Sequence, residues 1–264
     1  MILARGDRLA QPSPWHNQRK WQMNSKTLTT FGCLGDFPPL DGTIEFYGRV
    51  NALMKPTMTV LDLGASTALW RQQDPSEYRC SLRPAKGKVA KLIGADIDPA
   101  VLTNKTTDEN LLIENGHVPL PDLSVDMIIC DYVLEHVEDP EAMERETCRL
   151  LKPGGVFCGR TPHRWNYVSI GARVVSNARH GKLIKHLQPV RGGTDFFPTY
   201  YRVNTMNAIG RIWRAENWAD HSYLYTSEPT YHFGSSLVYA FLSMAHKMLP
   251  MALTGNIFFF LVRR

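Results

Sequence analysis

Residues 60–153 contain three short apolar runs, and each run ends on an acidic residue or a glycine before a stretch that can be helical. The segments that hold these runs are 60–66, 93–99 and 126–136, which read V-L-D-L-G-A-S, I-G-A-D-I-D-P and D-M-I-I-C-D-Y-V-L-E-H. A run of Val, Leu, Ile or Met that closes on Gly or Asp is typical of a strand buried on both faces. Strands that alternate with helices predict an α/β fold, with a parallel sheet between helices and ligands at the carboxyl ends of the strands.

Four segments, in this order and spacing, resemble the motifs of the class I S-adenosylmethionine (SAM)-dependent methyltransferases. D-L-G-A-S at 62–66 is similar to the first motif, with an acid two residues before the first glycine, and Asp96 stands where the family places the acid that holds the ribose hydroxyls. Residues 131–140 and 149–155 are similar to the segments after the fourth strand and before the fifth. The resemblance implies a three-layer Rossmann-like methyltransferase fold, a mostly parallel sheet with a last antiparallel strand, and SAM as the cofactor.

The length of 264 residues suits one well-buried α/β domain and would be cramped for two. We therefore expect a single methyltransferase domain over residues 1–264. Its expected parts are an N-terminal arm or lid at 1–40, a SAM-binding core at 41–160, a substrate-side insertion at 161–203 and a C-terminal completion of the sheet at 204–264.

Composition narrows the function classes. Apolar residues make up 44% and charged residues 21% of the chain, which is ordinary for a soluble globular protein, and the net charge of +5 falls short of the basic footprint of a nucleic-acid binder. The five cysteines include no C-x-x-C pair and favour a reducing compartment. Neither a signal peptide nor a run near the ~18 apolar residues of a membrane-spanning helix is present, so we expect a cytoplasmic protein.

The resemblance assigns ten residues to the cofactor site: Asp62, Gly64, Ala65, Ser66, Asp96, Ile97, Glu114, Asn115, Asp131 and Tyr132. The G-x-G-x-G turn of the family reads Gly64, Ser66, Ala68 here, so one glycine remains, and a φ above zero at Ser66 would be strained. This departure favours an alternative in which the protein binds a partner without catalysis. Near Asp96, Asp98 and Pro99 form a predicted helix N-cap and first helical residue.

The wording at 131–134, D-Y-V-L, differs from the Asn/Asp-Pro-Pro-aromatic motif of nucleic-acid amino-methyltransferases, so a base substrate is disfavoured. It is closer to members that act on small molecules, and implies O-methyl transfer to a glycan, lipid or quinone-like metabolite. His136 and His163 are the candidate bases, although His136 can also cap a helix or pack beside the cofactor. Because Tyr132 replaces the first Glu of the E-x-x-E-H motif that holds a metal in some members, we expect no metal site.

The C-terminal half supplies the expected acceptor side. Tyr167, Tyr200, Tyr201 and Arg202 are predicted to line the acceptor pocket, and a purely structural lid is the alternative. A helix is expected over 204–218 and final strands over 221–226 and 256–262. An apolar stripe at helical spacing over 237–249 is expected to pack against the sheet; the alternative is a peripheral membrane contact or a partner subunit. The oligomeric state stays open.

Two further expectations concern competing interpretations. The basic stretch 71–88 reads as a solvated loop in preference to an anion site. A nicotinamide oxidoreductase is disfavoured because G-x-G-x-x-G is absent and Asp96 comes 32 residues after Gly64, compared with the ~20 of that fingerprint.

Overall fold

The computed structural model describes residues 37–38, 40–68, 70–74, 76–174, 198–227, 229 and 235–264. Nearly all of the predicted arm at 1–40 and much of the predicted insertion at 161–203 lie outside these residues. In the part of the chain that is described, no helix is long and apolar enough to cross a membrane.

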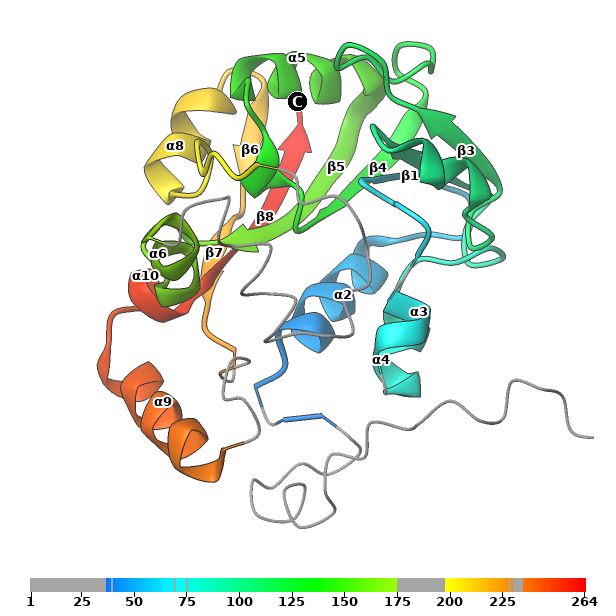
Figure 1. Cartoon of the computed structure of the whole chain (residues 1–264). Coiled ribbons are helices and arrows are strands. Elements are labelled where there is room, and N and C mark those ends of the chain that lie inside the picture. Colours follow the sequence, from blue (N-terminus) through cyan, green and yellow to red (C-terminus); the bar gives the residue numbers. More distant parts are fainter. Residues whose placement is uncertain are drawn as a thin grey trace, which may run out of the picture.

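The described residues form one sheet of eight strands in the order β3-β2-β1-β4-β5-β8-β6, with β7 also paired to β8 (Figure 1). The strands are β1 (Thr59–Leu63), β2 (Lys91–Asp96), β3 (Glu109–Leu112), β4 (Val125–Asp131), β5 (Leu151–Pro162), β6 (Trp218–Asp220), β7 (Tyr223–Tyr225) and β8 (Asn256–Arg263). Strands β1 to β5 are parallel, whereas β8 is antiparallel to β5, β6 and β7. The predicted mostly parallel α/β sheet with a last antiparallel strand is confirmed.

Helices cover both faces of the sheet and make three layers (Figure 1). The helices of the described residues are α2 (Gly42–Leu53), α3 (Trp70–Gln73), α4 (Glu77–Leu82), η2 (Pro99–Thr103), η3 (Leu134–His136), α5 (Pro140–Leu150), α6 (Tyr167–Val174), α8 (Met206–Ile212), α9 (Ser236–Met248) and α10 (Met251–Thr254). The predicted cap is confirmed, because the Asp98 side chain accepts a hydrogen bond from the Ala100 amide and Pro99 is the first residue of η2.

Alternate residues of the parallel strands feed two apolar cores. Phe46, Tyr47 and Val50 of α2 pack on the face that carries Val60 and Ile129, among other residues. The opposite core holds the residues between them along the strands, with α5 and α8: Leu61, Ile93, Ile128, Leu150, Ile209 and Trp213 are members. Because successive strand side chains point to opposite faces, the continuous apolar runs of the sequence serve both cores at once.

The C-terminal half departs from two expectations. The expected helix at 204–218 ends at Ile212, and Trp218 instead begins β6, which pairs with the end of β8. The apolar stripe over 237–249 forms α9 as expected, but Leu237 is 84% exposed and Phe241 is 64% exposed, so packing of this stripe against the sheet is wrong. An apolar stripe at helical spacing fixes which residues share a face, and says nothing of what that face meets.

Phe46 tests the contribution of α2 to the fold. Its side chain is fully buried, and its ring lies 5.6 Å from that of Phe258, centroid to centroid. We expect Phe46→Ala to lower the free energy of unfolding by about 3–5 kcal/mol, because it removes a buried ring and leaves a cavity. Leu53→Ala on the same helix, where Leu53 is 41% exposed, is the control and should stay within about 0.5 kcal/mol. Urea unfolding measures both; equal losses would show that α2 does not pack as described.

Candidate functional site

Three carboxylates gather where neighbouring parallel strands end. In the sheet register Asp62 of β1 is the partner of Gly94 and of Ile129, so Asp96 and Asp131 lie two residues further along β2 and β4. Residues two apart on a strand point to the same face, which here is the face covered by α2. The structure therefore brings together the three acids that the sequence assigns to the cofactor site.

The turn after β1 depends on Gly64. Its φ is +83°, and a Cβ at this position would lie 2.2 Å from Cγ2 of Val133. Both the backbone conformation and the close approach of Val133 therefore require glycine. The amide of Gly64 donates to the Ala95 carbonyl at 2.7 Å, which joins the turn to the end of β2.

Ser66 and Ala68, which stand where the family resemblance predicts glycine, have a left-handed backbone. Ser66 has a φ of +43° and Ala68 a φ of +56°, a conformation that costs on the order of 1–3 kcal/mol at a non-glycine residue. Hydrogen bonds fix the turn: the Ser66 amide donates to Asp96 Oδ2 at 2.9 Å, and Asn104 Nδ2 donates to the Ser66 carbonyl at 3.0 Å. The strained position foreseen at Ser66 is thus present.

Asp96 is oriented by backbone amides on both oxygens. Oδ2 accepts from Ser66 and Oδ1 accepts from the amide of Asp98 at 3.0 Å. A carboxylate has about four acceptor sites, so two amide bonds leave capacity for a pair of ligand hydroxyls. Ile97, the next residue, is 58% exposed and lies at the open edge of the sheet. Asp96 and Ile97 are therefore placed where a nucleoside could be held.

Asp131 is the centre of a buried ionic cluster. Its carboxylate accepts from Arg160 Nε at 2.5 Å and Nη2 at 3.0 Å, from Arg83 Nη1 at 3.1 Å and from the Tyr47 hydroxyl at 2.9 Å. Arg160 is 3% exposed and also donates to Thr43 Oγ1. Burial raises the pKa of Asp131, but the two guanidinium groups outweigh this and hold the pKa below its ordinary value.

Sequence reasoning missed Arg160, Arg83 and Tyr47. The sequence signal that could have revealed this cluster is Arg160, a cation inside the run V-F-C-G-R-T of β5. A charged side chain in a buried strand requires a partner of opposite charge. The expectation of a solvated basic loop at 71–88 is also wrong for two members: Arg83 pairs with Asp131, and Arg79 pairs with Asp41 and Asp74. Both arginine side chains are largely buried.

Asp62 has the opposite electrostatic environment. Burial is the main cause that raises its pKa to about 7, and the negative charges of Asp131 and Asp96 add to it, while Arg83 opposes them. The guanidinium groups are committed to Asp131, so Asp62 and Asp96 have no ion pair among the described residues, and Asp96 alone of these two accepts hydrogen bonds from backbone amides. A cationic ligand group beside Asp62 would stabilise its ionised form.

The segment after β4 joins the site to residues 198–202. Tyr132 has a φ of +56° and is 40% exposed, and the Arg160 guanidinium lies 4.7 Å from its ring centroid. The carbonyl of the buried Glu135 accepts from the amides of Tyr200 and Tyr201, and His136 Nδ1 lies 2.9 Å from the Pro198 carbonyl oxygen. These contacts bring His136 beside two of the four predicted acceptor residues.

The remaining predicted acceptor residues lie on two sides. Arg202 is exposed, donates to the Glu138 carbonyl and covers the Tyr200 ring at 5.3 Å. Tyr167 lies on α6, with its ring 5.6 Å from that of His246 on α9. The structure thus groups Tyr200, Tyr201 and Arg202 with η3, and places Tyr167 against α9.

His163 follows β5 and is 5% exposed. Its Nδ1 lies 2.8 Å from the Ala252 carbonyl of α10, and burial lowers its pKa. These contacts give His163 a structural task, joining the end of β5 to the segment before β8. The catalytic assignment of His163 stays a prediction.

Glu114 and Asn115 form part of an exposed two-residue turn. Glu114 and His117 form a β-bridge, with Asn115 at φ +52° and Gly116 at φ +74° between them. Positive φ at both central residues is the signature of a type I′ turn, for which Asn-Gly is the preferred sequence. The dipeptide therefore has a local structural reason, and contact with an adenine stays a prediction.

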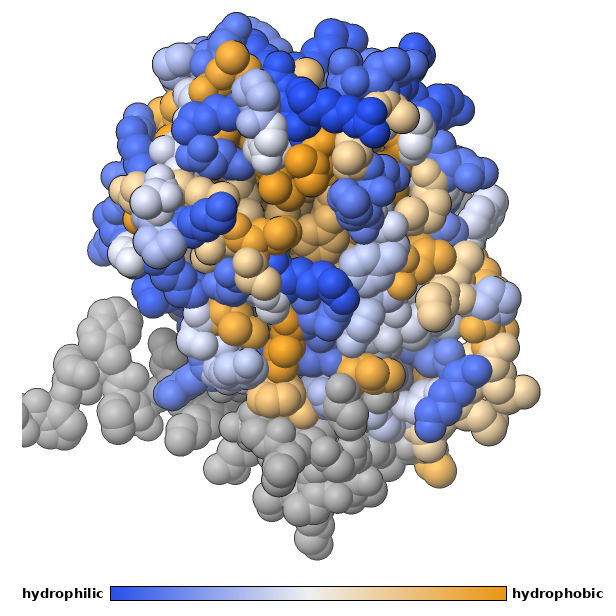
Figure 2. Space-filling model, turned by 180° about the vertical axis from the view of Figure 1, so that it is seen from behind, coloured by the Kyte–Doolittle hydropathy of each residue, from blue (hydrophilic) through white to orange (hydrophobic). Residues whose placement is uncertain are grey.

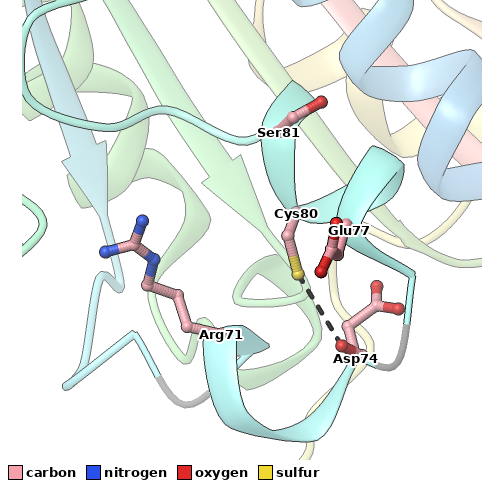
Figure 3. A pocket seen from close by; sticks show the side chains of 5 residues that line it. All are labelled: Arg71, Asp74, Glu77, Cys80 and Ser81. Atoms are coloured by element: carbon pink, nitrogen blue, oxygen red, sulfur yellow. Dashed lines mark hydrogen bonds between the residues drawn. The ribbon is translucent and has the colours of Figure 1, made fainter. Parts of the chain in front are cut away.

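A separate pocket of about 320 Å³ opens between α3 and α4, lined by Arg71, Asp74, Glu77, Cys80 and Ser81 (Figure 3). Cys80 Sγ lies 3.8 Å from the Asp74 carbonyl oxygen. Its lining comes from the two short helices and the connection between them, and includes none of the three strand-end acids. Over the described residues, no group of three or more His, Cys, Asp or Glu side chains is arranged to hold a metal ion.

Comparison with known proteins gives the following relatives. Residues 77–159 match a family described as a methyltransferase domain, a span that includes Asp96, Asp131 and His136. A Mycolicibacterium smegmatis protein named "Probable S-adenosylmethionine-dependent methyltransferase" is 37% identical over 28% of this chain and 30% of its own length. An arsenite methyltransferase of Halobacterium salinarum is 31% identical over 40% of this chain and 28% of its own length. A ubiquinone biosynthesis O-methyltransferase of Xanthomonas oryzae is 34% identical over 36% of this chain and 39% of its own length.

The matched part of the chain thus spans between 28% and 39% of the length of these curated relatives. Similar solved structures include a SAM-dependent methyltransferase from Aquifex aeolicus, at 14% identity and a TM-score of 0.47, covering 84% of this chain and 93% of that one. Another, an S-adenosylmethionine-dependent methyltransferase from Mesorhizobium loti, has 17% identity and a TM-score of 0.45, covering 82% of this chain and 96% of that one.

The ionic cluster supplies a stability test. Asp131→Asn removes the charge that neutralises the buried Arg160, so we expect the free energy of unfolding to fall by about 3–5 kcal/mol. Glu109→Gln breaks the exposed pair between Glu109 and Lys91 and is the control, with a loss of at most about 1 kcal/mol. Thermal or urea unfolding of both variants decides the matter. If Asp131→Asn behaves like the control, Arg160 does not depend on Asp131.

Proposed function

We propose that this chain transfers the methyl group of SAM to a small-molecule acceptor. The premise is that it carries a class I SAM-dependent methyltransferase domain. The single observation that carries this proposal is the convergence of Asp62, Asp96 and the Gly64 turn at adjacent strand ends. We retain the single-domain division, since one sheet includes strands from β1 to β8 and so supports it.

The residues at the strand ends suit SAM chemically. Asp96, already oriented by two amides, would accept hydrogen bonds from the ribose hydroxyls, and the turn at 64–66 would lie along the amino-acid end. Asp62, whose pKa is raised to about 7, would face a cationic group of the cofactor. In this arrangement Asp131 and Tyr132 act with Arg160 to shape the wall beside it. Bound SAM supplies an already activated methyl group on its sulfonium.

The protein's own contribution to the reaction would then be positioning and exclusion of water. Correct alignment alone can lower a barrier by ~7–11 kcal/mol in favourable cases. His136 is the better placed base of the two histidines, because it lies beside the Tyr200–Tyr201 segment. A proton on Nδ1, shared with the Pro198 carbonyl, selects the tautomer in which Nε2 is the basic nitrogen.

For the acceptor we propose a hydroxyl of a glycan, lipid or quinone-like metabolite, bound by Tyr200, Tyr201, Arg202 and Tyr167. The relatives support methylation of a small acceptor without agreeing on its atom, since their names specify arsenite in one case and an O-methyltransferase of ubiquinone biosynthesis in another. A cytoplasmic location and the absence of a nucleic-acid substrate belong to the same proposal.

A non-catalytic binding protein is the second candidate. The observation that favours it is the pair of strained residues, Ser66 and Ala68, at positions where the family resemblance places glycine. Calorimetry with SAM, S-adenosylhomocysteine and NADH separates the candidates, because only the methyltransferase proposal requires binding of both SAM and S-adenosylhomocysteine.

Asp96→Ala tests the ribose assignment. We expect it to weaken S-adenosylhomocysteine binding by at least tenfold, since it removes hydrogen bonds to two hydroxyls, each worth about 0.5–1.5 kcal/mol or more when charged. Asp108→Ala is not a suitable control, because Asp108 accepts from the Leu92 amide within the same sheet edge. Glu109→Gln, on the exposed side of β3, should leave the affinity unchanged. Unaltered binding by Asp96→Ala would remove the basis of the cofactor assignment.

Asp62 makes cofactor binding depend on pH. Its raised folded pKa means that stability from this group is present below the ordinary pKa of 3.8 and is lost as pH rises through about 7. A cationic cofactor group should lower that pKa again, so SAM binding should release a proton near pH 7 and tighten as pH rises from 6 to 8. Calorimetry in buffers with different ionisation enthalpies measures the release. Asp62→Asn should abolish it, and proton release that persists in this variant would assign it to another group.

A further inference from the structure

Among the described residues of the C-terminal half, the most exposed large apolar side chains form one stripe on α9 and α10. Its members are Leu237 (84% exposed), Phe241 (64%), Met244 (55%), Met248 (77%) and Met251 (56%). They follow one another at intervals of four, three, four and three residues, which places those on α9 along one face of the helix. In Figure 2, seen from behind, apolar surface gathers over α9 at the lower right.

The opposite side of α9 is attached to the rest of the protein, which fixes the direction of the stripe. His246 Nδ1 lies 3.0 Å from the Ser227 carbonyl oxygen, and the His246 ring lies 5.6 Å from the ring of Tyr167. The Ser235 side chain caps the first turn by accepting from the Val238 amide. The helix is therefore attached through the side that carries His246, and the stripe lies on the opposite side.

This stripe lies at the same edge of the sheet as the candidate site. Pro162, at the carboxyl end of β5, pairs with Asn256, the first residue of β8, and α10 immediately precedes β8. His163 contacts the Ala252 carbonyl of α10, and Trp165, two residues further on, is 50% exposed. A surface that received the stripe would thus lie on the side of the molecule where the parallel strands end.

The chemistry of the stripe favours lipid over a second copy of the chain. Leu, Phe and Met are the apolar side chains that enter the acyl boundary of a bilayer, and α9 has 13 residues. A helix of less than two heptads offers only a small contact surface, whereas a stable dimer usually buries about 1,200–2,000 Å² of accessible surface. Residues 235–254 contain no Asp or Glu, and Lys247 is exposed on the same helix. An apolar face with a cation and a nearby Trp suits the boundary of an anionic bilayer.

We propose that α9 and α10 bind the surface of a bilayer containing anionic phospholipid, and that the strand-end site draws its acceptor from that bilayer. Leu237, Phe241 and Met248 enter the acyl boundary, and Lys247 meets the lipid phosphates. The acceptor is then an amphipathic, membrane-dissolved molecule with a hydroxyl at the depth of the headgroups. The second half of this inference rests on the proposed methyl transfer, whereas lipid binding does not.

Flotation with vesicles tests the binding. We expect the protein to float with vesicles of phosphatidylcholine containing about one third phosphatidylserine, and less with phosphatidylcholine alone. Phe241→Ser/Met248→Ser should lower the vesicle affinity at least tenfold, and Lys247→Gln about fivefold for the anionic vesicles only. Leu40→Ser/Leu53→Ser, which also removes two exposed apolar side chains, is the matched control and should float like the unaltered protein.

Equal flotation of Phe241→Ser/Met248→Ser and the control, or no flotation at all, would overturn the proposal. Sedimentation without vesicles provides the check on a second copy: a dimer that Phe241→Ser/Met248→Ser dissociates would assign the stripe to self-association instead. Calorimetry with S-adenosylhomocysteine in the absence of lipid separates this inference from the proposed function. If Phe241→Ser/Met248→Ser binds S-adenosylhomocysteine normally but no longer floats with vesicles, the stripe is assigned to lipid binding. If this variant loses both S-adenosylhomocysteine binding and flotation, it is misfolded, and Met248→Ser alone replaces it in both assays.

Discussion

The candidate site depends on how three partly buried carboxylates that meet at one sheet edge differ in their electrostatic environment. Asp131 has two guanidinium groups and a hydroxyl, Asp96 has two backbone amides, and Asp62 has neither and is the acid with the raised pKa. Neighbouring carboxylates raise one another's pKa, and the positive charges of Arg160 and Arg83 offset this effect at Asp131. Neutralising Asp131 internally leaves Asp62 and Asp96 as the groups with capacity for a ligand.

This charge balance makes α2 and α4 part of the site although both lie outside the strand ends. Tyr47 and Thr43 of α2 bind Asp131 and Arg160, and Arg83 is the residue that caps α4. The Arg83 guanidinium also lies over the Tyr47 ring at 5.0 Å. The packing of α2 on the sheet and the electrostatics of the strand ends are therefore coupled, and a change in one is expected to reach the other.

The strands and the three acids could be predicted because both signals are local: an apolar run predicts the strand, and the acid is the last or next-to-last residue of that strand. The partners of Asp131 could not, since Tyr47 is 84 residues away and Arg83 is 48 residues away in the sequence, and no period relates them. Strand β6 was missed because three residues carry too little pattern to separate a strand from the end of a helix. The position of α9 was wrong for another reason: the same stripe would serve a buried or an exposed face.

Ser66 and Ala68 are the two non-glycine residues of the turn after β1 that have a positive φ. A serine or alanine at positive φ is costly, yet both residues keep the left-handed path, and Asn104 and Asp96 hold the backbone there by hydrogen bonds to Ser66. If the side chains of Ser66 and Ala68 were the functional groups of the turn, a backbone with negative φ would have a lower conformational free energy and would point these side chains in another direction. The hydrogen bonds that stabilise this strained path fix the position of the Ser66 peptide groups beside Asp96. Gly64 remains because Val133 leaves no room for any side chain at that one position.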